Sequence, residues 1–476
     1  MTGSGTLAGR TDSSGVTVLA IDTPGLGDRS YLAHDGQVAM VVDPQRDIDR
    51  VLELARAEGV RITHVAETHI HNDYVTGGFA LAAATGASCL VNADDQVSFR
   101  RTAVRDGDVV RVGTMSVRVM HTPGHTHTHL SYAVALGAEP VAVFTGGSLL
   151  YGSTGRPDLL GPDHTAQLVR AQWHSAQRLA DELPDSTAVY PTHGFGSFCS
   201  ATQSAGLAST IGEERRHNPA LTSDEAAYVD RLLAGLDAFP AYYAHMAPAN
   251  SAGPHAPELA LPAMADPDEL RSRIERGEWV VDLRSGTAFA AGHLAGSLSF
   301  PLDGQFVTYL GWLLPWGTPV TLLGETAEQV AAAQRELVRI GIDRPAAMAT
   351  GGPERWAGAG AELASHRRAD FAELAVALAS DNPPAVLDVR RAQERRAEYL
   401  LGSTHIPIHE VLDRLGAVPA GQVWVHCAGG YRAGIVAALL AARGHDVVAV
   451  DDAFEHARQL GMAVTQTTTS TQKDTV

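Results

Sequence analysis

Four short segments, each directly after a run rich in β-branched residues, constrain the fold of this chain more than any other feature. They cover residues 68–74, 121–125, 144–147 and 190–194. Such runs are typical of strands, and loops at the ends of strands commonly meet at a binding or catalytic site. Three of the segments carry histidine, and one of these also carries an aspartate. Imidazole and carboxylate groups brought together in this way predict a site for a first-row transition metal.

The part of the chain around these segments, residues 16–246, alternates short strand-like runs with turn signals and a few helical stretches. Many strands with few helices between them predict an αββα arrangement and argue against a doubly wound sheet. Small and polar residues dominate 1–15 and 466–476, which we predict to be disordered tails. A stretch rich in Pro, Ala, Gly and Asn, 247–262, is predicted to be a linker.

Beyond the predicted linker the chain repeats itself. Each half begins with a similar motif, WVVDLR around Asp282 and AVLDVR around Asp388, followed by alternating strand-like and helix-like segments. Strands and helices that alternate at this spacing predict two small parallel-sheet α/β domains. We place them at residues 263–365 and 366–465, so that the chain as a whole is predicted to be α/β.

Composition narrows the classes of function and of partner. The 476 residues carry a net charge of −18, which argues against nucleic acid or an anionic membrane surface as a partner. Three cysteines do not make a disulfide framework, so the reducing cytoplasm is the expected location. No apolar run approaches the roughly 18 residues of a membrane span, and the N-terminus lacks the profile of a signal peptide.

Taken in order, the four strand-end segments resemble those of the metallo-β-lactamase superfamily, and THIHNDYVTGG is similar to its persulfide dioxygenase branch. The resemblance implies one mononuclear Fe(II) per chain, held by two histidines and an aspartate. Matched by motif, His69 and His125 fall on the two histidine ligands. His71, Asp73 and His193 fall on positions that hold the second metal in dinuclear relatives, and they are further candidate ligands.

Two positions depart from the superfamily pattern. Tyr74 stands where the first motif has a further histidine, which argues against a dinuclear zinc hydrolase. Gly147 stands where the aspartate ligand is expected, so His71 or Asp73 has to turn inward, or the metal is lost. On this interpretation an aspartate at 147 should raise iron occupancy, and His193 should matter less for metal binding than His69 and His125. Residues 155–158 (GRPD) also resemble a motif of this branch, and they either support the site or form a surface turn.

Cys427 lies between a predicted buried strand, VWVH, and a helix predicted over 433–443. A short Gly-containing loop at a helix N-terminus offers backbone N–H groups to an anion, and the helix dipole adds to the effect. The loop therefore favours a thiolate, and Arg432 is expected to bring a fixed positive charge to the same pocket. The pattern indicates a nucleophilic cysteine, whereas Cys89 and Cys199 are expected to be structural.

The last domain resembles the rhodanese sulfurtransferases, from LDVR to AFEHA, with the six-residue loop that accepts a sulfane sulfur. The resemblance implies that Cys427 is the sulfur-accepting nucleophile and that Arg432 is part of the catalytic loop. It also implies that the remaining loop residues cradle the substrate: Ala428, Gly429, Gly430 and Tyr431. The preceding repeat resembles rhodanese in fold only, because Gly324 and Gln329 replace the cysteine and the arginine. Thr326 with Gln329 predicts a helix capping box instead, so this repeat is predicted to be catalytically inactive.

The order of these three domains resembles that of persulfide dioxygenase–rhodanese fusions. It implies oxidation of a low-molecular-weight persulfide by O2 to sulfite, and transfer of sulfane sulfur from thiosulfate or a persulfide to a thiol through Cys427. Dimers are common among such enzymes, so a homodimer is a further expectation. Two alternatives stay open, a sulfurtransferase with a metal-poor lactamase-like scaffold and a zinc thioester hydrolase of the glyoxalase II type.

Overall fold

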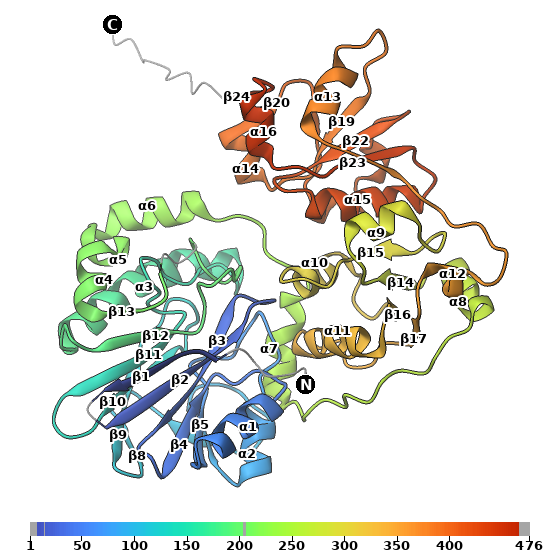
Figure 1. Cartoon of the computed structure of the whole chain (residues 1–476). Coiled ribbons are helices and arrows are strands. Elements are labelled where there is room, and N and C mark those ends of the chain that lie inside the picture. Colours follow the sequence, from blue (N-terminus) through green and yellow to red (C-terminus); the bar gives the residue numbers. More distant parts are fainter. Residues whose placement is uncertain (1–6, 14, 203–205, 466–476) are drawn as a thin grey trace, which may run out of the picture. The chain divides into compact units, whose positions relative to one another are not determined.

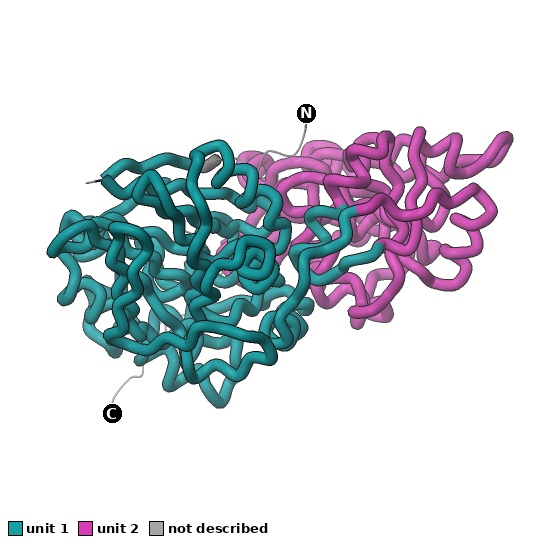
Figure 2. Tube along the Cα trace, turned by 90° about the horizontal axis from the view of Figure 1, so that it is seen from below, with its two compact units in different colours: residues 1–259, 334–344 teal, residues 260–333, 345–476 magenta. Residues whose placement is uncertain are grey.

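The computed structural model describes residues 7–13, 15–202 and 206–465 (Figure 1). The chain divides into two compact units, one containing 1–259 and 334–344 and the other containing 260–333 and 345–476 (Figure 2). We call them unit 1 and unit 2. Among the described residues, no helix is both long and apolar enough to cross a membrane.

Unit 1 is built on two β-sheets that pack face to face. The seven strands of the first sheet follow in chain order: β1 (Leu7–Ser13), β2 (Val16–Thr23), β3 (Asp28–His34), β4 (Val38–Val42), β5 (Arg61–Ala66), β6 (Ser88–Asn92) and β7 (Thr102–Val104). The six strands of the second sheet lie in the order β13 (Ser209–Thr210), β12 (Ala188–Pro191), β11 (Pro140–Gly146), β10 (Leu130–Ala135), β9 (Met115–His121) and β8 (Val109–Val112). Alternate side chains of both sheets, including Tyr31, Val119, Tyr132 and Phe144, form one buried core between them.

Helices cover the outer faces of both sheets. Val51 and Ala55, four positions apart on one face of α1 (Asp49–Ala57), pack with Leu81 of α2 (Gly78–Thr85) on the first sheet. On the second sheet, Val169 and Ala176 of α3 (Pro162–Glu182) form the core together with residues of the next helices. These are α4 (Ile211–His217), α5 (Pro219–Thr222) and α6 (Glu225–Gly235). The layers run helix, sheet, sheet, helix, so the predicted αββα arrangement is confirmed.

The N-terminal segment differs from the predicted disordered tail. Strand β1 pairs antiparallel with β2, with Arg10 opposite Leu19 and Asp12 opposite Thr17. The prediction for 7–13 is wrong because strand pairing uses backbone groups, which small and polar residues supply as well as apolar ones. The rest of the predicted tails, 1–6, 14 and 466–476, lies outside the described residues, apart from a turn at Gly15.

The predicted linker, 247–262, is helical in its first part. Helix α7 (Tyr243–Ala252) contains Pro248 and ends at Gly253, whose φ of 81° is the left-handed conformation that favours glycine. Composition is a poor guide here because buried hydrogen bonds made by Asn250 hold this helix against the rest of unit 1. The remainder, 253–262, is mostly without regular structure.

Unit 2 contains two parallel sheets, as the repeat predicts. In the first, strands lie in the order β15 (Leu298–Ser299), β14 (Trp279–Asp282), β16 (Val320–Gly324) and β17 (Ala347–Thr350). In the second the order is β18 (Arg367–Ala369), β23 (Val447–Val450), β22 (Val423–His426), β19 (Ala385–Asp388) and β21 (Thr404–His405). A separate antiparallel pair consists of β20 (Glu398–Leu400) and β24 (Ala463–Thr465).

Helices connect these strands. The first repeat has α8 (Pro267–Glu275), α9 (Gly286–Ala291), α10 (Phe306–Leu313), α11 (Ala327–Arg339) and α12 (Pro353–Ala357). The second has α13 (Phe371–Leu378), α14 (Ala392–Ala397), α15 (Tyr431–Ala441) and α16 (Phe454–Gln459). The repeated motif forms the same buried ion pair twice, Asp282 with Arg284 at 2.6 Å and Asp388 with Arg390 at 2.8 Å. Both pairs fix the turn after the first central strand, which explains why the motif recurs.

Candidate functional site

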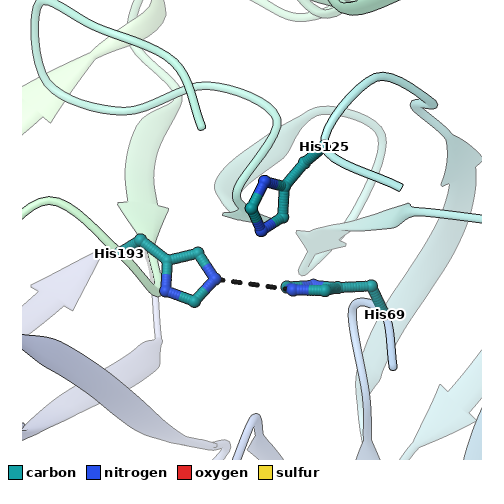
Figure 3. A group of neighbouring side chains, drawn as sticks. All are labelled: His69, His125 and His193. Atoms are coloured by element: carbon teal, nitrogen blue, oxygen red, sulfur yellow. Dashed lines mark hydrogen bonds between the residues drawn. The ribbon is translucent and has the colours of Figure 1, made fainter. Parts of the chain in front are cut away.

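Three histidine side chains meet where strands of both sheets of unit 1 end. His69 follows β5, His125 follows β9 and His193 follows β12. The rings point toward one another (Figure 3), and one nitrogen of each lies within 4.8 Å of one nitrogen of the other two. The Nε2 atoms of His69 and His193 are 3.5 Å apart. All three are buried, with exposed fractions of 2%, 0% and 0%.

The ring of His69 is held by a chain of two hydrogen bonds. Its Nδ1 lies 2.9 Å from the hydroxyl oxygen of Thr68, and that hydroxyl donates to a carboxylate oxygen of Asp43 at 2.7 Å. Because the hydroxyl proton is used on Asp43, the oxygen of Thr68 accepts the proton of Nδ1. Nε2 of His69 therefore keeps its lone pair, which is the form that binds a metal ion.

Oxygen atoms hold the other two rings in the same manner. Nδ1 of His125 donates to the carbonyl of Arg156 at 2.8 Å, and its Nε2 has no hydrogen-bond partner among the described residues. Nδ1 of His193 faces two carboxylates, Asp28 at 2.9 Å and Asp73 at 3.2 Å. Each ring thus has Nδ1 fixed by a protein oxygen, which leaves Nε2 for a metal. This arrangement is typical of metal-ligating histidines.

Burial and neighbouring charges give the three rings different proton affinities. Burial, and then the neighbouring histidines, lower the pKa of His69 well below 6.5 and that of His125 to about 3. Burial also lowers the pKa of His193, but the carboxylates of Asp73 and Asp28 outweigh it and raise this pKa to about 10. Two rings are therefore neutral near pH 7, while the third carries a proton that a metal ion has to displace.

His71 lies beside this cluster, and its Nε2 is surrounded by oxygen atoms. It is 3.3 Å from Asp43, 3.4 Å from Glu67 and 3.0 Å from the hydroxyl of Tyr74. Burial lowers the pKa of His71, but Asp43 and then Glu67 outweigh it and raise this pKa to about 9. Tyr74, which replaces the histidine of the superfamily motif, therefore contacts His71 and holds it among acidic side chains.

The predicted ligands form two overlapping groups. His69, His125 and His193 make the first, and His71, Asp73 and His193 make the second, each with ligand atoms within 4.8 Å. His193 is the shared member, and it completes a group of three nitrogens with His69 and His125. The geometry thus favours a larger part for His193 than the motif comparison implies.

Gly147, which replaces the expected aspartate, lies against the ring of His125. A Cβ atom at Gly147 would lie 2.4 Å from Cδ2 of His125, and one at Gly155 would lie 2.8 Å from its Nδ1. Carbon atoms in favourable contact are about 3.5–4.0 Å apart, so the ring fits because both neighbours are glycine. This arrangement argues against the expectation that an aspartate at 147 adds a ligand, since its side chain would have to displace His125 first.

Several residues that hold the cluster were missed by the sequence analysis. They are single polar side chains outside the motifs: Asp28, Asp43, Glu67, His129 and Asn250. Asp43 and Glu67 carry a recognisable signal, because each directly follows a strand, as the ligands do. His129 is buried, and its Nε2 accepts from the backbone N–H of Gly147 at 3.0 Å, so this nitrogen is already used by the fold.

The GRPD motif contacts the ring of His125 and holds it in place. The guanidinium of Arg156 donates to both oxygens of Asp158 at 2.7 Å, and Arg156 is 4% exposed. Its backbone carbonyl is the group that accepts the proton of His125. Of the two interpretations of this motif, the buried supporting role agrees with the structure, and a surface turn does not.

The loop of Cys427 lies between β22 and α15, as the strand-then-helix pattern predicts. Cys427 is 1% exposed, whereas Ala428 and Gly429 are exposed. Gly430 precedes the helix with a φ of 87°, and a Cβ atom there would lie 1.9 Å from a carboxylate oxygen of Asp451. Glycine is therefore required at this position. Helix α15 begins at Tyr431, two residues before the predicted start.

Arg432 departs from the expected role of a free positive charge. Its guanidinium donates to both carboxylate oxygens of Glu394 at 2.6 and 2.7 Å. Both side chains are mostly buried, at 10% and 23% exposed. The carboxylate neutralises the positive charge that the loop sequence places next to Cys427, and this partner could not be predicted from the loop sequence.

The corresponding loop of the first repeat carries no side chain at the position of the nucleophile. Gly324 ends β16, and Gln329 accepts from the backbone N–H of Glu325 at 2.7 Å through its side chain. The backbone N–H of Gln329 donates to the hydroxyl of Thr326 at 3.2 Å. One half of the predicted capping box is therefore present. In the other half, the side chain of Gln329 accepts from the backbone N–H of Glu325 instead of that of Thr326. The loop therefore caps the N-terminus of α11.

The other two cysteines are buried, and burial with nearby carboxylates outweighs the opposing charge of Arg156 near Cys199. Burial raises the pKa of Cys89 to about 12, with a further contribution from Glu67. Burial, and then Asp73, raise the pKa of Cys199 well above 9. Both are poor nucleophiles in this state, which agrees with their predicted structural role.

Comparison with known proteins gives two family matches. Residues 24–193 match the metallo-β-lactamase superfamily. Residues 266–359 and 371–458 match the rhodanese-like domain. Both matches agree with the two families, and with their order along the chain, that the motifs predict.

Individual relatives are similar to unit 1. The hydroxyacylglutathione hydrolase of Pseudomonas entomophila is 32% identical over 209 residues, 39% of this chain and 77% of that protein. The chain spans only 57% of the corresponding hydrolase of Polaromonas. The human protein named Persulfide dioxygenase ETHE1, mitochondrial, is 27% identical over 201 residues, 41% of this chain and 70% of that protein.

One solved structure is similar over most of the chain. A metallo-β-lactamase from Staphylococcus aureus has a TM-score of 0.64 and 29% identity, and the match covers 72% of this chain and 100% of that one. The two facing sheets, the strand-end histidines and these similarities agree. The chain therefore belongs to the metallo-β-lactamase superfamily, with rhodanese-like domains following its metallo-β-lactamase domain.

Proposed function

We propose that the protein oxidises a low-molecular-weight persulfide to sulfite at one metal ion and transfers sulfane sulfur through Cys427. The observation that carries the first half is the set of three Nε2 atoms of His69, His125 and His193. Each ring has its Nδ1 tied to an oxygen, so that Nε2 faces the metal position, and His193 becomes a neutral ligand when the metal displaces its Nε2 proton. The human persulfide dioxygenase similar to unit 1 supports this choice of reaction.

The donor set fits a metal of the first transition row. Imidazole nitrogen suits iron, zinc and copper, and the buried Nε2 of His125, which has no hydrogen-bond partner among the described residues, is available to such a metal. Bound by these residues, iron would supply the reaction of O2 with the persulfide sulfur. Three neutral ligands leave the full charge of a divalent ion in place, which favours an anionic substrate such as a persulfide.

The residues of the chain then have three tasks at this centre. They bind the metal, they hold the ligand protons on the Nδ1 side, and they keep bulk solvent away from the metal, since the cluster is buried. The overall reaction consumes one O2 and one water for each persulfide and yields the thiol and sulfite. Asp28 and Asp73 keep the proton of His193 on Nδ1 and stabilise the ring in the ligating orientation.

Cys427 is the proposed site of sulfur transfer. Its thiolate attacks the outer sulfur of thiosulfate and a new S–S bond forms. The S–S bond of thiosulfate breaks, and its electron pair leaves on sulfite. The result is a persulfide on Cys427, which a thiol acceptor attacks in the same way. Joining both activities in one chain raises the effective concentration of each product at the other site.

A zinc thioester hydrolase is the second candidate. The similarity to hydroxyacylglutathione hydrolases favours it, and three histidines are also a known ligand set for catalytic zinc. Tyr74 and Gly147 count against it because a dinuclear site would need ligands at both positions. A sulfurtransferase with an inactive lactamase-like domain is the third candidate, and Gly147 is its only support.

Purification without oxygen and metal analysis separate these candidates. We expect about one iron per chain, O2 uptake with glutathione persulfide and production of sulfite, all retained in Cys427→Ser. Zinc together with hydrolysis of a glutathione thioester and no O2 uptake would overturn the proposal in favour of the hydrolase. Protein that contains no metal but still transfers sulfur would refute the oxidation of persulfide and support only sulfur transfer through Cys427.

A further inference from the structure

The loop that carries the first metal motif, residues 69–76, is held by the side chain of Asn250. The amide nitrogen of Asn250 donates to the carbonyls of His71 at 2.9 Å and Tyr74 at 2.8 Å. Its amide oxygen accepts from the backbone N–H of Thr76 at 2.8 Å. Asn250, which lies on helix α7 outside the segment that carries the ligands, thus joins the two ends of the six-residue stretch 71–76.

These bonds use both amide protons and one lone pair of a side chain that is 1% exposed. No residue of another type reproduces two donors and one acceptor in this geometry. An aspartate would set its oxygen against the two carbonyls, and an alanine would leave both carbonyls and the N–H without their partner. The backbone of the loop would then lose the only side chain described here that ties His71, Tyr74 and Thr76 together.

A second segment, the end of helix α11, holds the same loop. The backbone N–H of Val75 donates to the carbonyl of Arg339 at 2.7 Å. The guanidinium of Arg339 donates to both oxygens of buried Asp47 at 3.1 and 2.7 Å. Arg50 pairs with the same carboxylate at 2.7 Å. These contacts all lie within unit 1, to which residues 334–344 belong.

We propose that Asn250 and Arg339 are positioning residues for the metal centre. They touch no ligand atom, but they fix the backbone from which His69, His71 and Asp73 project. Both lie outside residues 24–193, the part of the chain that matches the metallo-β-lactamase superfamily. The repeat that is predicted to be catalytically inactive therefore contributes, through the end of α11, to the affinity of the metal site and is more than a spacer. The inference concerns metal affinity only and holds for iron or zinc.

The test is the affinity of metal-free protein for zinc, measured by competition with a chromophoric chelator. We expect Asn250→Ala and Asn250→Asp to bind zinc about 10–100-fold more weakly, as is usual for residues that orient metal ligands. Hydrogen exchange of residues 70–76 in the metal-free protein should be faster in both variants. Asn218→Ala is the matched control, since Asn218 is also buried and bonds to the carbonyls of Leu150 and Ser153.

Arg339→Gln and Arg335→Gln form a second pair on one helix. Arg335 pairs with Asp49 at 2.8 Å and more distantly with Asp47 at 3.4 Å, and among the described residues no backbone hydrogen bond joins it to residues 69–76. We expect Arg339→Gln to weaken zinc binding, Arg339→Lys to restore part of it, and Arg335→Gln to leave it unchanged.

Two results would overturn the inference. One is wild-type zinc affinity in Asn250→Ala. The other is an equal loss in Asn250→Ala and Asn218→Ala, which would reduce the effect to general stability. Because zinc alone is the probe, a failure here is distinct from a failure of the proposed oxidation of persulfide.

Discussion

Replacing Gly147 with alanine or aspartate should weaken the metal site, although an aspartate is the residue that the family pattern would put there. The reason is steric. The new Cβ atom would lie 2.4 Å from Cδ2 of His125, roughly 1 Å closer than an ordinary carbon contact. The backbone of Gly147 has no left-handed φ, so the strain of a new side chain comes from the clash with the ring and not from the backbone conformation.

The magnitude follows from what has to move. Overpacking a buried site costs about 1–3 kcal/mol. A ring displaced by that distance also loses the hydrogen bond from Nδ1 to Arg156, worth about 1 kcal/mol net. We therefore expect Gly147→Ala to lower the free energy of unfolding of the metal-free protein by about 2–4 kcal/mol and to weaken metal binding at least tenfold.

Metal titration and thermal unfolding of Gly147→Ala, Gly147→Asp and Gly235→Ala check this reasoning. Gly235 is the control, because a Cβ atom there meets nothing within 4 Å and alanine is the better helix former. If Gly147→Asp bound metal more tightly than the wild type, the aspartate would be a usable ligand and the steric account would be refuted.

Three further predictions address the other groups. Cys427→Ser should abolish sulfur transfer from thiosulfate to cyanide while circular dichroism stays unchanged; full activity would remove Cys427 from the mechanism. Glu394→Gln should lower the Tm, because it leaves the largely buried charge of Arg432 without its partner. The same variant should lower the KM for thiosulfate, because the freed guanidinium can bind the dianion. An unchanged KM would place Arg432 outside the substrate pocket. Metal affinity should fall about tenfold for each unit by which the pH is lowered between 8 and 6, because the metal must displace the proton of His193, whose pKa is raised to about 10. A metal affinity that does not change with pH, measured by metal titrations across this range, would contradict that protonation state.

The layers of the fold could be predicted because they depend on patterns that lie close together in the sequence. Short strand-like runs predict the two facing sheets of unit 1, and the repeated motif around Asp282 and Asp388 predicts the two parallel sheets of unit 2. Strand β1 and helix α7 could not be predicted from composition. The first depends on backbone pairing with β2, and the second is held by the buried contacts of Asn250.

The candidate site was predictable where a ligand follows a strand, and not where a partner comes from far along the chain. His69, His125 and His193 each follow a strand-like run, so their convergence could be predicted. The preparation of His193 by Asp28, 165 residues away, could not. Nor could the pairing of Arg432 with Glu394, which depends on how α14 packs beside the cysteine loop.

The most direct test of the central claim is the metal content of His193→Ala after reconstitution with iron under nitrogen. His64→Ala is the control, since His64 lies on β5, half-buried, and belongs to neither ligand group. Three nitrogen ligands predict about one iron per chain in the wild type and the control, and almost none in His193→Ala. Full iron content in His193→Ala, with loss in His71→Ala or Asp73→Ala, would contradict the three-histidine centre.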